Sequence, residues 1–281
     1  MAGVRIVTDS SCDLPQTLID EHRIGVVPLT IRFGEEEFVD RVELSAKAFY
    51  EKMATNPNLP ETAAPSPGAF QEEFTRMADE GADTVVCINL SSGLSATMAS
   101  AQNAAKSLAG KVDVRVVDSR SITAGLGMQA IEAAKRAESG ASADDIVALV
   151  EDMSTRTHVF GALDTLENLK KGGRIGGAQA MLGTMLSIKP ILDISTGVVE
   201  EAGKQRTRKK AMLWLRDKVL AAGPVENLCL CSGEAPDFEE FRALMGEKVD
   251  LAQTLDMTIG ATIGAHGGPR MLGLVWQTPA S

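Results

Sequence analysis

Short apolar runs alternate with longer amphipathic segments through the first half of the chain. This pattern predicts strands at 4–8, 24–31, 85–90 and 112–118, and helices at 14–22, 44–54, 68–80, 94–108 and 123–139. The run from Val85 to Leu90 is continuous and β-branched, which favours a parallel strand covered on both faces. The first half, 1–155, is therefore predicted to be a Rossmann-like α/β domain with a parallel sheet.

The pattern changes after residue 155. Strands are predicted at 157–163, 188–194, 198–203, 228–232, 255–259 and 272–276, with helices at 207–221 and 238–245. Ser195-Thr196-Gly197 joins two of these strands as a hairpin. Hairpins mixed with β-α-β segments predict an α+β domain over 156–281 with a largely antiparallel sheet, and a ligand is expected between the two domains.

Composition narrows the class of protein. The chain has 281 residues, of which 44% are hydrophobic and 23% charged, as expected for two globular domains. A net charge of -10 argues against a nucleic-acid partner. Four cysteines without the spacing of a zinc site indicate a reducing, cytoplasmic location and no metal. We expect no membrane span, because no apolar run approaches the roughly 20 residues that one needs.

The segment after the 85–90 strand offers the clearest candidate binding site. Ser91, Ser92, Gly93 and Ser95 gather at the start of a predicted helix, where the helix dipole and free N–H groups favour an anion. The turn holds no Lys or Arg, so it suits a single negative charge better than a triphosphate. The alternative interpretation is that these hydroxyl groups only cap the helix.

Two other strand ends carry similar polar residues. Asp9 follows the strand at 4–8 and Asp118 ends the strand at 112–118, each with serines close behind. In a parallel sheet such ends lie at one edge, where ligands of open α/β sheets bind. A shared polar pocket is the favoured interpretation, and helix capping by each residue separately is the alternative.

A glycine-rich cationic segment lies between the predicted domains. Lys170 and Lys171 suit the end of a helix capped by Gly172. That interpretation leaves Arg174 unexplained. An exposed Arg174, flanked by the apolar residues of 181–186, is a candidate docking point for a partner protein.

Two further candidates lie near the C-terminus. Arg206 belongs to a cationic cluster at 204–210, at the start of a predicted helix, where the helix dipole makes cations unfavourable. His266 stands in the glycine-rich segment 263–269, where it can be either a core contact or a ligand contact.

Eight sequence blocks together resemble the DegV family of bacterial proteins over essentially the whole chain. They are VTDSSCDLP (7–15), TAAPSP (62–67), LSSGLSAT (90–97), VVDSRSITAGLG (116–127), LKKGGRI (169–175), SIKPIL (187–192), GKQRTRKKA (203–211) and IGAHGGP (263–269). The resemblance implies a protein that holds one long-chain fatty acid between two domains. It also implies that some members are the lipid-carrying subunit of fatty acid kinase and present the carboxylate to an ATP-binding subunit.

The resemblance assigns roles to individual residues. It places Thr62 and Ser92 on the fatty acid carboxylate, with His266 and Arg206 supporting the head group. Lesser candidates are Ser91, Ser95 and the Gly93 N–H. Arg174 corresponds to a surface arginine that contacts the kinase partner. The chain departs from the family pattern at Ala63, Ala64 and Gly177, which removes two polar contacts and weakens the case for one particular kinase.

Two hypotheses of different classes follow. The first is a fatty-acid carrier without catalysis of its own and without a cofactor, for acids of roughly C14 to C18, since each buried methylene contributes about 0.8 kcal/mol. The second is a phosphoryl- or acyl-transfer enzyme that uses Asp9, Ser92 and His266. The absence of a P-loop and of a nucleophile elbow from the sequence argues against the second.

Overall fold

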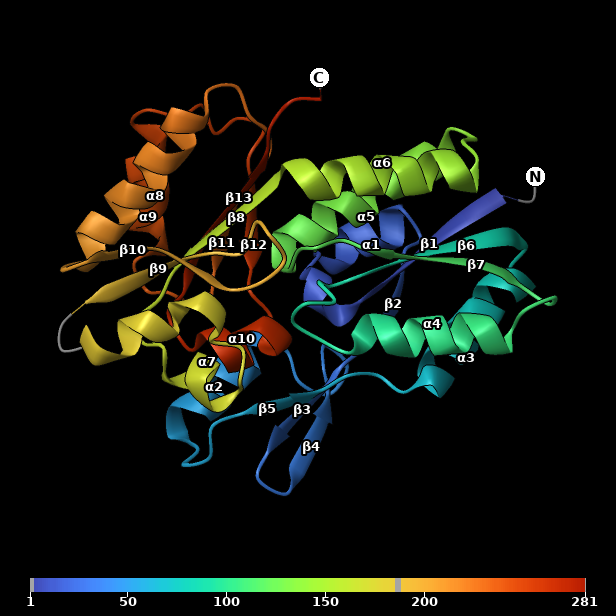
Figure 1. Ribbon diagram of the computed structural model, residues 1–281, viewed down its shortest axis with the longest axis horizontal. Helices are drawn as coiled ribbons and strands as arrows, with labels where there is room; N and C mark the ends of the chain where they lie inside the picture. Colours follow the sequence, from blue (N-terminus) through green and yellow to red (C-terminus); the bar gives the residue numbers. More distant parts are fainter. Residues whose placement is uncertain (1–2, 185–187, 281) are drawn as a thin grey trace.

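The computed structural model describes residues 3–184 and 188–280. Its N-terminal part is built on a four-stranded sheet of order β2-β1-β6-β7, in which every pair is parallel. The strands are β1 (Gly3–Asp9), β2 (Gly25–Val27), β6 (Ala82–Asn89) and β7 (Asp113–Asp118). Helices α3 (Pro67–Asp79) and α4 (Thr97–Ser107) cover one face, and α5 (Thr123–Glu138) and α6 (Ala143–Arg156) cover the other (Figure 1).

The side chains of β6 explain this three-layer arrangement. Val85 and Cys87 pack in the cluster that includes α3 and α4, whereas Val86 and Ile88 pack in the cluster that includes α5 and α6. A strand that is buried on both faces has an apolar residue at every position, which is the pattern that the sequence shows. The prediction of a parallel sheet is confirmed.

The C-terminal part is a six-stranded sheet of order β10-β9-β8-β13-β11-β12. All its pairs are antiparallel except β11 with β12. The strands are β8 (Thr157–Ala162), β9 (Lys189–Asp193), β10 (Glu200–Gln205), β11 (Glu226–Ser232), β12 (Leu255–Thr258) and β13 (Leu272–Gln277). The predicted, largely antiparallel second sheet is confirmed.

Helices cover both faces of this second sheet. Helices α8 (Arg208–Ala222) and α9 (Phe238–Gly246) pack on one face, and α5 of the N-terminal part lies against the other. The short elements α7 (Glu167–Lys171), η2 (Gly176–Thr184) and α10 (Ala261–Gly267) complete this part of the chain. The change of sheet falls between α6 and β8, and the division into domains 1–155 and 156–281 stays a prediction.

A third, small sheet was not predicted. Pro28 divides the expected 24–31 strand into β2 and β3 (Thr30–Phe33), and β3 pairs with β4 (Glu36–Val39) and β5 (Glu61–Ala63). The sheet is antiparallel, has the order β4-β3-β5 and lies beside α2 (Ala46–Thr55) at the bottom of Figure 1. Strand β5 is only three residues long within a proline-rich segment, which gives too little periodicity for prediction. Its pairing with β3 nevertheless fixes the position of Thr62.

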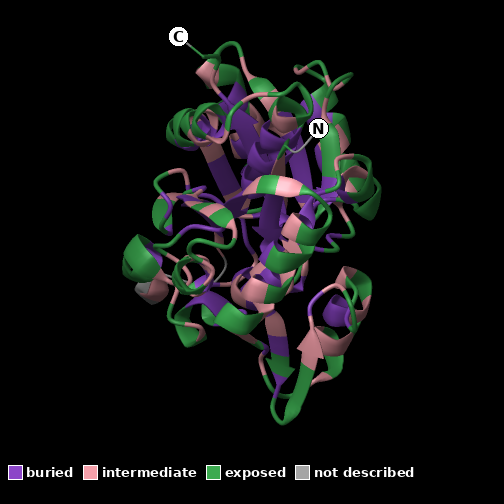
Figure 2. Ribbon diagram, turned by 90° about the vertical axis from the view of Figure 1, so that its right-hand side faces the viewer, coloured by how far each residue is buried: buried purple, intermediate pink, exposed green. Residues whose placement is uncertain are grey.

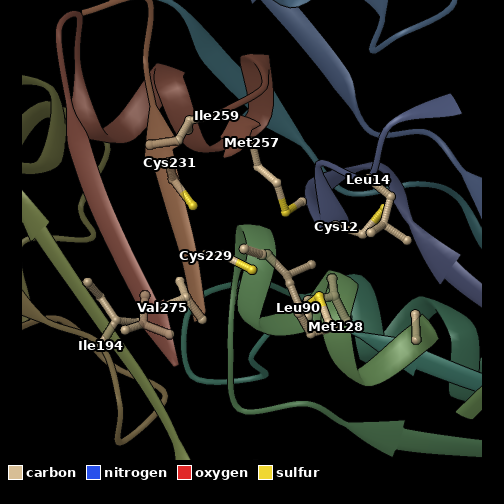
Figure 3. Packing of buried hydrophobic residues seen from close by; sticks show 14 of the residues in the cluster. Cys12, Leu14, Leu90, Met128, Ile194, Cys229, Cys231, Met257, Ile259 and Val275 are labelled. Carbon is tan, nitrogen blue, oxygen red and sulfur yellow. The ribbon is translucent and has the colours of Figure 1, made fainter. Parts of the chain in front are cut away.

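A sulfur-rich core joins the two sheets. Cys12, Met128, Cys229, Cys231 and Met257 belong to one buried cluster with apolar residues of both halves (Figure 3). The four cysteines are free and buried. Figure 2 shows the buried layer running continuously through the interior of the molecule. In the described part of the chain, no helix is long and apolar enough to cross a membrane.

Candidate functional site

An apolar cavity lies between the two sheets. Its floor is the face of β8, β9 and β13 that carries Val159, Leu192 and Val275. Its other walls come from the loops after β6 and β7, from β5 and from α10. Most of the lining is aliphatic, and the polar side chains that reach it are few. An apolar cavity with a few polar groups is typical of a small-molecule site.

Thr62 and His266 meet at the wall of this cavity. The Thr62 Oγ1 atom lies 2.9 Å from the Nε2 atom of His266, and both residues are half-buried. Burial lowers the pKa of His266 to about 4, and the charge of Arg174 adds to the effect. The imidazole is therefore neutral at neutral pH. Its Nδ1 atom has no hydrogen-bond partner among the described residues.

Arg174 supplies the positive charge beside this pair. Its Nε donates to the carbonyl of Leu94 at 3.1 Å, and its Nη1 donates to the carbonyl of Gly172 at 2.7 Å. The expectation of an exposed side chain is wrong, because Arg174 is half-buried and lines the cavity. Gly173 and Gly176 both have positive φ, and the turn that they allow lets the guanidinium reach the Leu94 carbonyl. Among the apolar residues expected around Arg174, Met185 and Leu186 lie outside the described residues.

A second pocket lies on the other side of these three residues. It is also lined by Glu61, Asn168 and Lys171. Thr62, Arg174 and His266 line both the apolar cavity and this polar pocket. They form the boundary between an apolar interior and a polar exterior.

Ser95 is the serine of the LSSGLS segment that lines the cavity. Its hydroxyl accepts from the N–H of Thr97 at 3.2 Å and lies 2.9 Å from the Thr97 hydroxyl. Because the Thr97 hydroxyl can donate to Ser95, the Ser95 proton remains available to a ligand.

The neighbouring candidates do not line the cavity. Ser91 donates to the carbonyl of Gly197 at 2.5 Å, and the Gly93 N–H donates to the Ser91 hydroxyl at 3.2 Å. Ser92 is exposed and donates to Asp118 at 2.5 Å. The expected meeting of Ser92 with Thr62 is therefore not found. The turn after β6 directs Ser91 towards the β9–β10 hairpin and Ser92 towards the end of β7.

The three strand ends do meet at one sheet edge, but their polar groups bind one another. Asp9 is buried and accepts from the side chains of Ser11 and Asn89 and from the N–H groups of Ser11 and Leu90. Burial raises the pKa of Asp9, and these donors oppose the rise. The expected single pocket is replaced by a structural network. Asp9 and Ser92 also do not reach His266, so the proposed catalytic trio is not assembled.

Arg206 also lies outside the cavity lining, on the surface after β10. Strand β10 is the edge of its sheet, and β9 and β8 separate it from β13, which follows α10. The next arginine, Arg208, is held by Asp237 at 2.9 Å. Arg206 is therefore not placed with His266.

Some residues that line the cavity were not predicted from the sequence. Thr262 lies one helical turn before His266 on α10, and its hydroxyl donates to the buried Asp40 at 2.7 Å. Two glycines, Gly161 and Gly273, also line the cavity. The spacing of Thr262 and His266 was a usable signal, since residues four apart share a helix face. No sequence signal marked the two glycines, because they are brought opposite each other only by the register of β8 and β13.

Comparisons with known proteins give consistent matches over the full length. The family model described as "Uncharacterised protein, DegV family" matches residues 3–278. A DegV domain-containing protein of Streptomyces coelicolor is 36% identical, with 97% of each chain covered. Protein DegV of Bacillus subtilis is 32% identical, with 98% of this chain and 99% of that protein covered.

Solved structures agree with these sequence matches. A DegV family protein from Thermus thermophilus, described by its fatty acid binding, superposes with a TM-score of 0.90 at 33% identity, covering 99% of this chain and 100% of that chain. DegV from Bacillus subtilis, described as a fatty acid binding protein, gives a TM-score of 0.85 at 30% identity with the same coverage. Both neighbours are described by what they bind rather than by a reaction that they catalyse.

Proposed function

The chain belongs to the DegV family, and from that premise we propose that it binds one long-chain fatty acid in the cavity between its two sheets. The carboxylate lies at Thr62, Ser95, His266 and Arg174, and the acyl chain fills the apolar interior. The observation that supports this best is the boundary formed by Thr62, Arg174 and His266 between an apolar cavity and a polar pocket. A fatty acid has the same division between a polar end and an apolar chain.

The apolar interior provides the affinity. Each methylene taken out of water contributes about 0.8 kcal/mol, so a dozen give on the order of 10 kcal/mol. Association costs about 4–15 kcal/mol, and the cavity is already formed, which keeps the cost of ordering low. A chain of about C14 to C18 is long enough for stable binding on this basis.

The polar boundary accommodates the carboxylate. Burying an unpaired carboxylate is prohibitive, so the head group requires donors at the wall. His266 is neutral and its Nδ1 lacks a partner among the described residues, so the tautomer with the proton on Nε2 is favoured, because it leaves no N–H donor buried without an acceptor. This Nε2–H donates to Thr62 Oγ1, and the Thr62 hydroxyl is then free to donate to the carboxylate. Arg174 supplies the compensating charge.

The polar pocket gives a second protein access to the head group. We propose an ATP-binding kinase subunit as this partner, with Arg174 at the contact. A carboxylate oxygen would attack the γ-phosphorus of ATP, the bond to ADP would break, and an acyl phosphate would form. Phosphate transfer to bound hexadecanoate should be seen with such a subunit and not without it. Transfer by the chain alone would contradict the carrier role.

The free, buried cysteines fit a reducing compartment, and we propose the cytoplasm as the location. We also propose that 1–155 and 156–281 act as the two domains that enclose the lipid.

The proposed function is tested by titrating delipidated protein with hexadecanoate and with hexadecanol in a calorimeter. The two ligands share an acyl chain, and only the acid carries a charge. We expect the acid to bind at least about tenfold more tightly, because charge-assisted hydrogen bonds contribute about 1.5–3 kcal/mol each. Equal affinities would show that the polar boundary does not receive the carboxylate.

A further inference from the structure

Two glycines face each other across the floor of the cavity. Gly161 on β8 is the register partner of Gly273 on β13. The same row continues to Leu192 on β9 and to Cys231 on β11. The centre of a row that crosses four strands therefore carries no side chains.

The rows on either side carry large side chains. Val159 and Leu163 lie two residues before and after Gly161, and Met271 and Val275 lie two residues before and after Gly273. All four line the cavity. The intervening residues, such as Phe160 and Leu274, pack on the opposite face, in the cluster that includes α8. The two glycines thus form a furrow across the strands, bounded by Val159 and Val275 on one side and by Leu163 and Met271 on the other.

Packing does not require glycine at position 161. A Cβ atom there would lie 3.5 Å from Leu163 Cδ1 and 4.0 Å from the Leu272 carbonyl oxygen, which are ordinary contacts. Its φ is not positive, so any residue can adopt the backbone conformation. Glycine inside a strand is also unfavourable. Gly273 differs, because a Cβ there would lie 2.9 Å from the Cβ of Cys231 (labelled in Figure 3).

We propose that the acyl chain of the fatty acid crosses the sheet in this furrow and that Gly161 determines how long an acid the cavity accepts. The inference rests on the proposed function. Met271 lies against Gly267, the neighbour of His266, so the Leu163 and Met271 side of the furrow is nearer to the head group. The first methylenes pass Met271, and only the later ones reach Gly161. A side chain at position 161 would therefore obstruct long acids and leave short ones unaffected.

The test measures the affinities of delipidated wild-type, Gly161→Ala and Gly161→Leu proteins for decanoate, dodecanoate, hexadecanoate and octadecanoate. We expect Gly161→Leu to lower the affinity for hexadecanoate and octadecanoate at least about tenfold, because one misplaced methylene in an apolar pocket costs about 10–200-fold. The affinity for decanoate should change by less than about threefold. Gly161→Ala should also lower the affinity for the long acids more than for decanoate, but by smaller factors.

Gly203→Ala and Gly203→Leu are the matched controls. Gly203 lies on β10 of the same sheet, and its Cβ would meet Trp214 at 3.5 Å, but it does not line the cavity. These variants should leave the chain-length preference unchanged. If Gly161→Leu does not fold, which its melting temperature will show, Gly161→Ala provides the test.

Two results would overturn the inference: unchanged affinity for octadecanoate in the Gly161 variants, or an equal loss for all four acids. Wild-type protein that binds none of the acids would contradict the proposed function itself, so the two failures are distinguishable.

Discussion

Replacing two hydroxyl groups, in the double variant Thr62→Val and Ser95→Ala, should weaken hexadecanoate binding by at least about 3 kcal/mol, on the order of a hundredfold in Kd. Both side chains line the cavity: Thr62 lies at the polar boundary, and Ser95 follows Leu94, whose carbonyl accepts from Arg174. Each can donate a proton to the carboxylate, because Thr62 receives one from His266 and Ser95 receives one from Thr97. Without these donors, only Arg174 and His266 remain beside the carboxylate, and the desolvation of its oxygens is not fully compensated. Calorimetry on delipidated protein measures the loss.

Ser92→Ala is the control for this double variant. Ser92 lies three residues before Ser95, but its hydroxyl is exposed and bound to Asp118. Its removal should change the Kd by less than about twofold, because surface substitutions have small effects. A loss of affinity in Ser92→Ala as large as in the double variant would show that the carboxylate lies at Ser92 and not at Ser95.

The second large effect concerns stability and pH. Asp13 is buried at the junction of the two halves, with its Oδ1 beside Gly260. Burial raises the pKa of Asp13 from 3.8 to about 7, and the charge of Asp40 adds to the rise while Arg41 opposes it. A carboxyl group whose pKa is raised by folding stabilises the protein below the pKa of the unfolded chain. This contribution is lost as the pH rises through the folded value.

Asp13→Asn should therefore remove part of the pH dependence. The free energy of unfolding of the wild type, minus that of Asp13→Asn, should fall by about 4 kcal/mol between about pH 4 and about pH 8. Urea unfolding at a series of pH values measures both proteins. Asp20→Asn, at an exposed position of α1 (Gln16–Glu21), is the control. Its free energy of unfolding should change with pH in parallel with that of the wild type. Parallel curves for Asp13→Asn would show that Asp13 does not titrate in this range.

The sequence predicts the two large sheets because their strands carry strong patterns. Val85 to Leu90 shows burial on both faces, and the Ser195-Thr196-Gly197 turn marks the β9–β10 hairpin. The pattern fails at β3, β4 and β5, where strands of three or four residues are held by pairing with one another. Such strands have almost no periodicity of their own, so local sequence contains little information about them.

The candidate site was predicted only in part, because its assembly depends on contacts between residues distant in sequence. Thr62, His266 and Ser95 were named as candidates, and all three line the cavity, with Thr62 and His266 in contact. The choice among the serines depended on the path of the turn, which sends Ser91 to Gly197 and Ser92 to Asp118. The importance of Gly161 depends on its register with Gly273, which only the assembled sheet shows. Spacing along the chain does not encode pairing between residues that are distant in sequence.

The central claim is that the cavity holds one fatty acid, and native mass spectrometry of protein purified from cells without added lipid tests it most directly. The account predicts a population heavier than the chain by the mass of a single fatty acid of roughly C14 to C18, released on denaturation and identified in the extract. A spectrum with only the bare chain before delipidation, together with no uptake of hexadecanoate afterwards, would contradict it.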